Sequence, residues 1–287
     1  MRIELSLAAL LLPILLFAQE NVKVKGRIVN VQGEAVEYVQ IGMPQRQIGT
    51  ISTADGRFEM EVPCDTLEFF HVSYQPASYV VTGPSDEVVV VLQEQELPPA
   101  VSIGGDTKEK YLLRPGKKVL GNHAVISISL RNGRPGGREL GSVAQTKKPF
   151  LVEDILLSVR SNQIPGCVAS INIYRIEGEK ESFVNVLHKP IYFDIAVSDK
   201  PQDYNIRPEE TLILEPGRYF IAFQTVGCDE QAVQDFLAKP EGDRKSWEMT
   251  LDCIAYFKSS YLREAALGEM KHYPVNIGVS VKGLEYQ

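Results

Sequence analysis

The chain has 287 residues, of which 44% are hydrophobic, and a formal net charge of −7 at pH 7. This length is enough for two domains of ordinary size, each with its own core. The negative charge argues against a nucleic-acid partner, which requires a basic face, and against adsorption to an anionic bilayer.

Residues 1–18 have the pattern of a secretory signal peptide. Arg2 stands near the start, a nearly unbroken apolar run covers residues 5–17, and Ala18 precedes polar residues. A run of about 13 residues is shorter than the roughly 20 that a membrane-spanning helix needs. The segment therefore predicts a protein exported to the periplasm, the outer membrane or the cell surface, with no transmembrane span. No cysteine stands near the cleavage region, which argues against a lipid anchor.

The next segment is expected to form four strands, at residues 22–29, 38–41, 48–53 and 57–62. In the first strand apolar residues alternate with Lys and Arg, which is the period of an antiparallel-type strand with one buried face. In the fourth strand Phe58, Met60 and Val62 share one face. Asp55 and Gly56 lie between the third and fourth strands, and this pair predicts a tight hairpin.

Three more strands are expected at residues 67–72, 78–82 and 88–92. The unbroken valine run in the last of them predicts a strand that is buried on both faces. Residues 94–105 hold two prolines and two glycines with scattered charge, and they are predicted to be a linker between two domains.

The order of these segments resembles the carboxypeptidase-regulatory-like domain. The matching motifs are VKGRIVN from residue 24, GEAVEYV from residue 33, IGTISTADGRF from residue 48 and LEFFHVSY from residue 67. Such domains are common in exported proteins of Bacteroidetes-type bacteria, including the segment ahead of many TonB-dependent outer-membrane receptors. The resemblance implies a seven-stranded, prealbumin-like Greek-key sandwich over residues 21–93. It implies no peptidase activity, because the domain is the non-catalytic companion of metallocarboxypeptidases.

Residues 106–287 are again mostly β. Strands are expected at residues 123–130, 150–159, 168–176, 183–187, 191–196, 211–214, 218–226, 251–258 and 275–281. This number of short strands predicts a jelly-roll-type sandwich. Only residues 230–237 have helical spacing. The motifs RELGS, INIYRI and VNIGVSV also resemble a carboxy-terminal sandwich that accompanies the regulatory-like domain in uncharacterised exported Bacteroidetes proteins, and this resemblance implies no activity.

The metal and thiol ligands show no recognised spacing. The four histidines are far apart in sequence, at His71, His123, His188 and His272, so neither a metal nor another cofactor is predicted. The four cysteines lack CxxC spacing. In an oxidising compartment they allow three pairings, of which we prefer Cys228 with Cys253, and buried free thiols are the alternative.

A glycine-rich loop over residues 131–138 is the most distinctive local feature of the second region. Its bare backbone N–H groups, together with Arg134 and Arg138, can cradle an anion. However, the segment from Glu139 to Val143 is expected to continue as a strand rather than as the helix that follows a phosphate loop. A crossover between strands is therefore the favoured interpretation.

Aromatic residues near the end of the chain are the best lead for ligand binding. Trp247, Tyr256, Tyr261 and Tyr273 fall near a segment that connects strands, and loops at one end of a sandwich often form ligand sites. Trp247 and Tyr256 are alternatively core residues, which is the favoured interpretation. Tyr261, close to Arg263, is expected to be the most exposed of the four.

Two functions remain open. The first is a non-enzymatic cell-envelope module that binds an envelope protein or a glycan, with Trp247, Tyr261, Arg263, Arg134 and Arg138 as candidate ligand-binding residues. The second is a hydrolase that acts on polysaccharide, because carboxylates are plentiful and a glycosidase needs two of them facing across a cleft. No catalytic motif is present, which favours the binding module. The sequence leaves the oligomeric state open.

Overall fold

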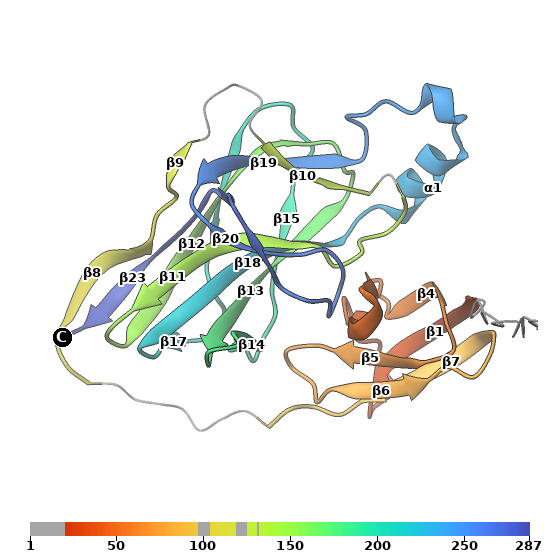
Figure 1. Ribbon diagram of the computed structural model, residues 1–287, viewed down its shortest axis with the longest axis horizontal. Helices are drawn as coiled ribbons and strands as arrows, with labels where there is room; N and C mark the ends of the chain where they lie inside the picture. The colour runs from red at the N-terminus through yellow and green to blue at the C-terminus, as the bar shows by residue number, and fades with distance from the viewer. Residues whose placement is uncertain (1–20, 97–103, 119–124, 131) are drawn as a thin grey trace, which may run out of the picture.

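The computed structural model describes residues 21–96, 104–118, 125–130 and 132–287. The chain is all-β, and its two sandwiches lie against each other (Figure 1). The predicted signal peptide and residues 97–103 of the predicted linker lie outside the described residues. In the described ranges, no helix is long and apolar enough to cross a membrane.

The N-terminal sandwich contains seven strands, as the sequence predicts. They are β1 (Val22–Asn30), β2 (Gln40–Met43), β3 (Ile48–Ile51), β4 (Arg57–Val62), β5 (Thr66–Phe70), β6 (Ala77–Val80) and β7 (Ser85–Leu92), with a 3-10 helix η1 (Pro44–Arg46) after β2. One sheet has the order β4-β1-β7 and the other the order β3-β2-β5-β6. β1 is antiparallel to β4 and parallel to β7, so the predicted antiparallel pairing holds on one side only.

The alternation of apolar and polar residues in the sequence determines which side chains form the core of this sandwich. Val24 and Ile28 of β1 and Phe58 and Met60 of β4 are buried between the two sheets, as their period of two predicts. Gly26 lies in the same register. A Cβ there would collide with the Phe58 ring and the Val88 carbonyl, so the position requires glycine. The glycine therefore allows β4 and β7 to approach β1 from both sides.

Two predictions for this sandwich are wrong. The Asp-Gly turn is present, with Gly56 at φ 76°, but it does not close a hairpin between paired strands. It instead carries the chain from β3 in one sheet to β4 in the other. The valine run of β7 is buried on one face only, since Val89 is 64% and Val91 53% exposed. Val89 and Val91 lie on the face of the three-stranded sheet that is turned away from the core between the two sheets.

The C-terminal sandwich holds the remaining elements. Its strands are β8 (Thr107–Leu113), β9 (Lys117–Lys118), β10 (Val125–Ser129), β11 (Glu139–Thr146), β12 (Phe150–Asn162), β13 (Cys167–Glu177), β14 (Ser182–Asn185), β15 (Ile191–Ile195), β16 (Gln202–Ile206), β17 (Leu212–Leu214), β18 (Gly217–Gly227), β19 (Thr250–Phe257), β20 (Ser260–Arg263), β21 (Lys271–Tyr273), β22 (Asn276–Ile277) and β23 (Val279–Tyr286). The helices are α1 (Glu230–Ala238) and the 3-10 turn η2 (Glu241–Asp243).

Two large sheets face each other across the main core. The nine-stranded sheet is built on the order β10-β19-β12-β23-β8, and the seven-stranded sheet on β14-β13-β18-β11-β20-β21. Between them lie side chains such as Phe150, Ile155, Ile173 and Phe223. The glycine-rich loop connects β10 in one sheet to β11 in the other, which confirms the predicted crossover.

Every strand predicted in this region overlaps an observed one, and the predicted helix is α1. Asp229 caps α1 by accepting a hydrogen bond from the Ala232 N–H at 3.1 Å, and Val233 and Phe236 bury its apolar face. The strand expected at residues 275–281 is interrupted, so that β22 and β23 pair with different neighbours.

Candidate functional site

The N-terminal sandwich lies against part of the seven-stranded sheet (Figure 1). Its glycines Gly42 and Gly49 lie so close to the Ala266 carbonyl that a Cβ at either position would collide with it. Hydrogen bonds cross the same boundary, including Ile51 N–H to the Pro135 carbonyl at 3.2 Å. The Ser73 hydroxyl also donates to the His188 carbonyl, at 3.0 Å. We call this contact surface the inter-sandwich interface.

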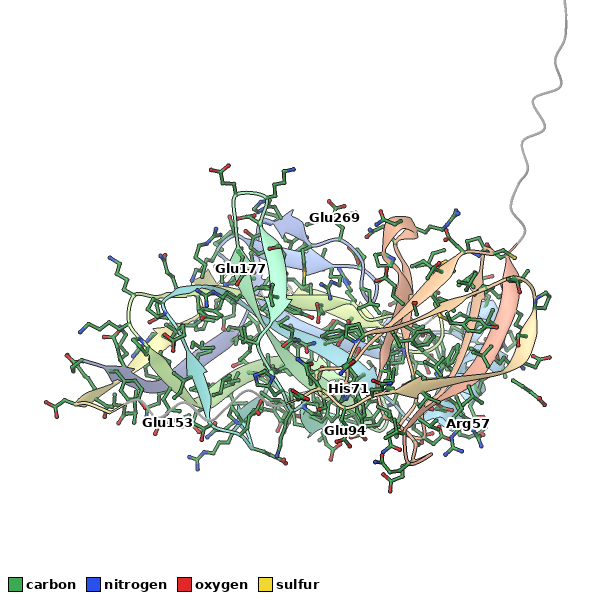
Figure 2. All side chains as sticks on the ribbon, turned by 90° about the horizontal axis from the view of Figure 1, so that it is seen from below. Arg57, His71, Glu94, Glu153, Glu177 and Glu269 are labelled. Atoms are coloured by element: carbon green, nitrogen blue, oxygen red, sulfur yellow. The ribbon has the colours of Figure 1, made fainter. Side chains whose placement is uncertain are left out.

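His71 lies in this interface, at the place where it is labelled in Figure 2. The Ser73 N–H donates to its Nδ1 at 3.2 Å, so the neutral ring carries its proton on Nε2 and donates to the Tyr192 hydroxyl, also at 3.2 Å. The Tyr192 ring in turn packs edge-on against Tyr38, with centroids 5.0 Å apart. Burial lowers the pKa of His71 to about 4, because the interface desolvates the charged form.

Beneath the N-terminal sandwich lies a buried polar group of five residues, which we call the Glu139 cluster: Glu139, Asn172, Tyr174, Gln224 and Arg263. Glu139 is fully buried, and its Oε1 accepts hydrogen bonds from Asn172 Nδ2 and from the Tyr174 hydroxyl, both at 2.7 Å. Arg263 Nη1 lies 3.1 Å from Glu139 Oε2 and 3.3 Å from the Tyr174 hydroxyl. The cluster is thus a buried ion pair, and neutral groups make part of the further hydrogen bonds that its two charged side chains can form.

Burial and neighbouring charges both shift pKa values in this cluster. Burial raises the pKa of Tyr174, and the adjacent Glu139 carboxylate raises it further. Burial alone would lower the pKa of Arg263, but Glu139 and Tyr174 more than offset it and leave that pKa raised. Tyr174 is therefore a neutral donor, and Arg263 a cation whose charge is already balanced by Glu139.

A groove opens beside the cluster at the edge of the interface, with a volume of about 540 Å³. We call it the β14 groove. Its lining is largely apolar and aromatic, with a few polar groups: Phe70, Val72, Gln75, Pro76, Gln95, Tyr174, Phe183, Val184, Asn185, Leu187, His188, Arg263 and Leu267. Arg263 Nε and His188 Nδ1 are buried there without a hydrogen-bond partner among the described residues. An apolar cavity with a few convergent polar groups is the usual form of a ligand site.

The strand β14 forms one wall of this groove and is the end strand of its sheet. Val184 pairs with Arg175 on β13, and the Val186 N–H donates to the Ile173 carbonyl, which places residues 184 and 186 in hydrogen-bonded positions. The main-chain groups of the alternate residues, Phe183 and Asn185, therefore point away from β13. Within the described part of the chain, no strand pairs with that outer edge.

The candidate residues predicted from the sequence do not gather at one site. Arg263 lies in the β14 groove. Trp247 is 60% exposed and lies in a separate depression, so the favoured core interpretation was wrong for Trp247, whereas Tyr256 is buried as that interpretation expects. Arg134 pairs with Glu230 at 3.0 Å.

Arg138 does not offer a free charge to an anion either. Its Nε lies 3.2 Å from Glu264, and its Nη1 donates to the Ser127 carbonyl at 2.7 Å. Both candidate arginines of the glycine-rich loop are thus engaged in holding the crossover in place.

Tyr261 is buried, which contradicts the expected exposure. Its ring packs edge-on against Phe183 with centroids 4.8 Å apart, and its hydroxyl donates to Glu181 Oε2 at 2.8 Å. This hydrogen bond, together with Arg218 at 3.0 Å, lowers the pKa of Glu181. The polar neighbours of Tyr261 in the sequence suggested exposure, but β20 places the ring on an apolar patch of the sheet.

The predicted Cys228–Cys253 disulfide is absent, since both are free thiols. Cys228 follows β18 of the seven-stranded sheet, whereas Cys253 lies within β19 of the other sheet and faces the core. Burial raises the pKa of Cys228 to about 11 and also raises that of Cys253. Among the described residues, no group of three or more His, Cys, Asp or Glu side chains could hold a metal ion.

Sequence analysis missed Glu139, Asn172 and Gln224. Asn172 lies between Ile171 and Ile173, and this alternation correctly places it on the outer face of the sheet. A polar residue on an outer face is expected to meet solvent. Here the N-terminal sandwich covers that face, and a local pattern carries no signal for such a contact.

No protein-family model matches the chain, and no curated protein matches its sequence. Among solved structures, the chain is similar to a DUF3823 family protein from Parabacteroides merdae ATCC 43184, with 10% identity, 90% of this chain and 98% of that chain covered, and a TM-score of 0.21. A DUF3823 family protein from Bacteroides ovatus ATCC 8483 has 8% identity over 72% of this chain and 97% of that chain, with a TM-score of 0.21.

A third similar structure is that of a “putative carbohydrate binding protein” from Bacteroides uniformis ATCC 8492, with 10% identity, 90% of this chain and 98% of that chain covered, and a TM-score of 0.22. At these TM-scores the likenesses carry no conclusion about the function of this chain. The resemblance to the carboxypeptidase-regulatory-like domain therefore stays a prediction, as does the division into domains at residues 94–105.

Proposed function

We propose that the chain is an exported, non-catalytic binding module of the cell envelope, and that the β14 groove holds an extended peptide segment of a partner protein. The observation that carries this proposal is that the open edge of β14 borders the large apolar groove. An extended peptide adds to such an edge through main-chain hydrogen bonds, and pockets beside the edge select its side chains.

The groove offers a matching set of contacts. The outward main-chain groups of Phe183 and Asn185 provide the pairing positions for a new strand. Beside them, Phe70, Val72 and Leu187 line the space for an apolar side chain of the peptide. These groups come from both sandwiches, so a bound peptide would contact both.

The polar groups favour a peptide segment without charge. Arg263 Nε is buried without a hydrogen-bond partner among the described residues, and the guanidinium charge is already balanced by Glu139 at 3.1 Å. Within the described part of the chain, the lining contains no aspartate or glutamate. Recognition therefore rests on shape, apolar burial and hydrogen bonds rather than on charge attraction.

The placement in the envelope is supported by the signal-like pattern of residues 1–18 and by the resemblance of residues 21–93 to a domain of exported proteins. An accessory role beside outer-membrane uptake rests on where such domains occur, which is an argument by analogy.

The test is selection of a phage-displayed random 12-residue peptide library on the full chain, followed by calorimetric titration of the enriched synthetic peptides. The Val184→Glu variant places a charge on the 47%-exposed residue of β14, and we expect it to weaken binding at least about 10-fold. The control is Val197→Glu, which puts the same charge at a 55%-exposed valine outside the groove and should leave the affinity unchanged. Failure to enrich any peptide, or equal affinity in both variants, would refute the proposal.

A further inference from the structure

The only tryptophan of the chain stands at the surface, in the segment between η2 and β19. Trp247 is 60% exposed and borders a depression of about 250 Å³. The other lining residues are Val125 and the polar residues Arg160, Ser161, Gln163, Asp199, Thr250 and Asp252. We call this depression the Trp247 site. An exposed indole beside polar groups offers a ligand both an apolar ring face and hydrogen-bonding partners.

The two carboxylates of the site are held in fixed orientations. Asp252 of β19 accepts hydrogen bonds from the hydroxyls of Ser127 at 2.6 Å and Ser161 at 3.2 Å. Asp199 accepts from Gln163 Nε2 at 2.6 Å. Each carboxylate oxygen has more than one lone pair, so both groups can still accept from a ligand.

Arg160 supplies donors on the same side. It lies where the pairing of β12 with β19 shifts register between Val159 and Ser161, and such a bulge re-aims the side chain at that position. Its Nη1 makes a long hydrogen bond of 3.5 Å to the Asp199 main-chain carbonyl. In the described ranges, this hydrogen bond is the one polar contact of its guanidinium. Most of its donors therefore remain open to a ligand.

We propose that the Trp247 site binds a neutral sugar residue of a glycan and does not hydrolyse it. A sugar ring has an apolar C–H face that can lie on the indole, and a rim of hydroxyls that both donate and accept. The site places two carboxylate acceptors and one guanidinium donor group around the indole, and hydrogen bonds to charged groups are the stronger ones. With two carboxylates against one guanidinium, the local charge repels acidic sugars.

The size of the depression restricts what fits. Drug-sized ligands occupy pockets of about 300–1,000 Å³, and this depression is smaller. It accommodates a single ring, so the glycan would be held by one residue with the rest of the chain in solvent.

This site is independent of the β14 groove. Its residues come from β10, β12, β19 and adjacent loops of the nine-stranded sheet, whereas the N-terminal sandwich lies against the other sheet (Figure 1). A protein partner in the groove and a glycan at the Trp247 site can therefore bind at the same time.

Because the chain has one tryptophan, its intrinsic fluorescence reports on this site directly. The experiment is titration of the full chain with soluble neutral oligosaccharides of glucose, xylose, mannose and galactose, with oligogalacturonate as the acidic probe. We expect at least one neutral probe to change the Trp247 emission saturably, and calorimetry to give the same dissociation constant. The acidic probe should leave the emission unchanged.

Variants then separate the site from the rest of the surface. Trp247→Ala should weaken the calorimetric affinity for the same oligosaccharide about 30-fold, the size of effect expected for a central aromatic contact. Asp252→Asn should weaken it while retaining the ring. The control is Phe257→Ala, which removes a comparably exposed ring, 59% exposed, at the other end of β19 and should change the affinity less than twofold.

Three results would overturn the proposal. The first is that none of the neutral probes binds. The second is binding that persists in Trp247→Ala or that leaves the Trp247 emission unchanged. The third is the appearance of new reducing ends during the titration, because the site would then be a catalytic one.

Discussion

Acidification should weaken the inter-sandwich interface through a single residue, His71. Its buried ring is neutral, and burial lowers its pKa from 6.5 to about 4. Protonation would also remove the lone pair on Nδ1 that accepts the Ser73 N–H at 3.2 Å. Charging the ring in place therefore costs both its solvation and a hydrogen bond.

The sign follows from proton binding in the two states. Between pH 6.5 and pH 4, His71 in the unfolded chain binds a proton and His71 in the folded chain does not, so the free energy of unfolding falls as the pH falls through this window. One pKa unit corresponds to about 1.4 kcal/mol, so the loss reaches about 3 kcal/mol near pH 4. Well above pH 6.5 neither state binds a proton at His71, and the residue then contributes no pH dependence.

The assay is urea unfolding of the wild type and of His71→Gln at several pH values between 7.5 and 4. A glutamine can accept from Ser73 and donate to Tyr192, but it does not titrate. Carboxylates and the other histidines titrate in both proteins, so the difference between the two curves isolates His71. We expect the wild type to lose about 3 kcal/mol relative to the variant between pH 6.5 and pH 4. Parallel pH dependences in the two proteins would refute the reasoning.

Three further predictions follow from buried contacts. Arg263→Met leaves the Glu139 carboxylate buried without its cation and should lower the free energy of unfolding by about 3–5 kcal/mol. In a double-mutant cycle measured with urea, Arg263→Met combined with Glu139→Gln should cost less than the sum of the two single changes. Gly49→Ala pushes a Cβ into the Ala266 backbone and should destabilise the protein by about 1–3 kcal/mol in thermal unfolding, while Gly83→Ala, where a Cβ meets nothing within 4 Å, should be neutral. Non-reducing denaturation followed by alkylation and mass spectrometry should modify both Cys228 and Cys253, and a mass two hydrogens lower with neither thiol modified would contradict the free-thiol assignment.

The local sequence pattern was sufficient to predict core residues in each sandwich. The alternation of Phe58, Met60 and Val62 matches their burial, and α1 begins at its predicted position because Asp229 caps it. These features depend on residues that are close in sequence. Strands without such a pattern were missed, including β8, in which five consecutive residues are exposed, and β16, which is mostly polar. Exposed strands of this kind carry no hydrophobic period to detect.

The β14 groove could not be predicted to the same extent, because it depends on contacts between the two sandwiches. Asn172 and Gln224 are polar residues at outward positions, and only the docking of the N-terminal sandwich makes them buried. Packing within the C-terminal sandwich buries Tyr261 and places Cys228 and Cys253 in different sheets. The sequence favoured a core position for Trp247, whereas its exposure depends on a loop conformation that residue type does not determine.

The position of the β14 groove connects peptide binding to the titration of His71. The groove is lined by Phe70 and Val72, the two neighbours of His71 in the chain, and by residues of the C-terminal sandwich. A ligand that contacts both sandwiches binds the docked arrangement more tightly than an undocked one. Linkage then requires that anything that weakens docking also weakens the apparent affinity of the ligand.

A peptide that binds the groove should therefore bind the wild type more weakly at pH 4.5 than at pH 7, once protonation of His71 populates undocked molecules. In His71→Gln the same change of pH should have a smaller effect, because the interface no longer titrates at this position. Calorimetric titration of one peptide against both proteins at both pH values measures the coupling directly. The Trp247 site lies wholly within the C-terminal sandwich, so a sugar bound there should show no such difference between the two proteins. An equal loss of peptide affinity in both proteins would show that binding in the groove does not depend on the titration of His71, and would contradict the coupling.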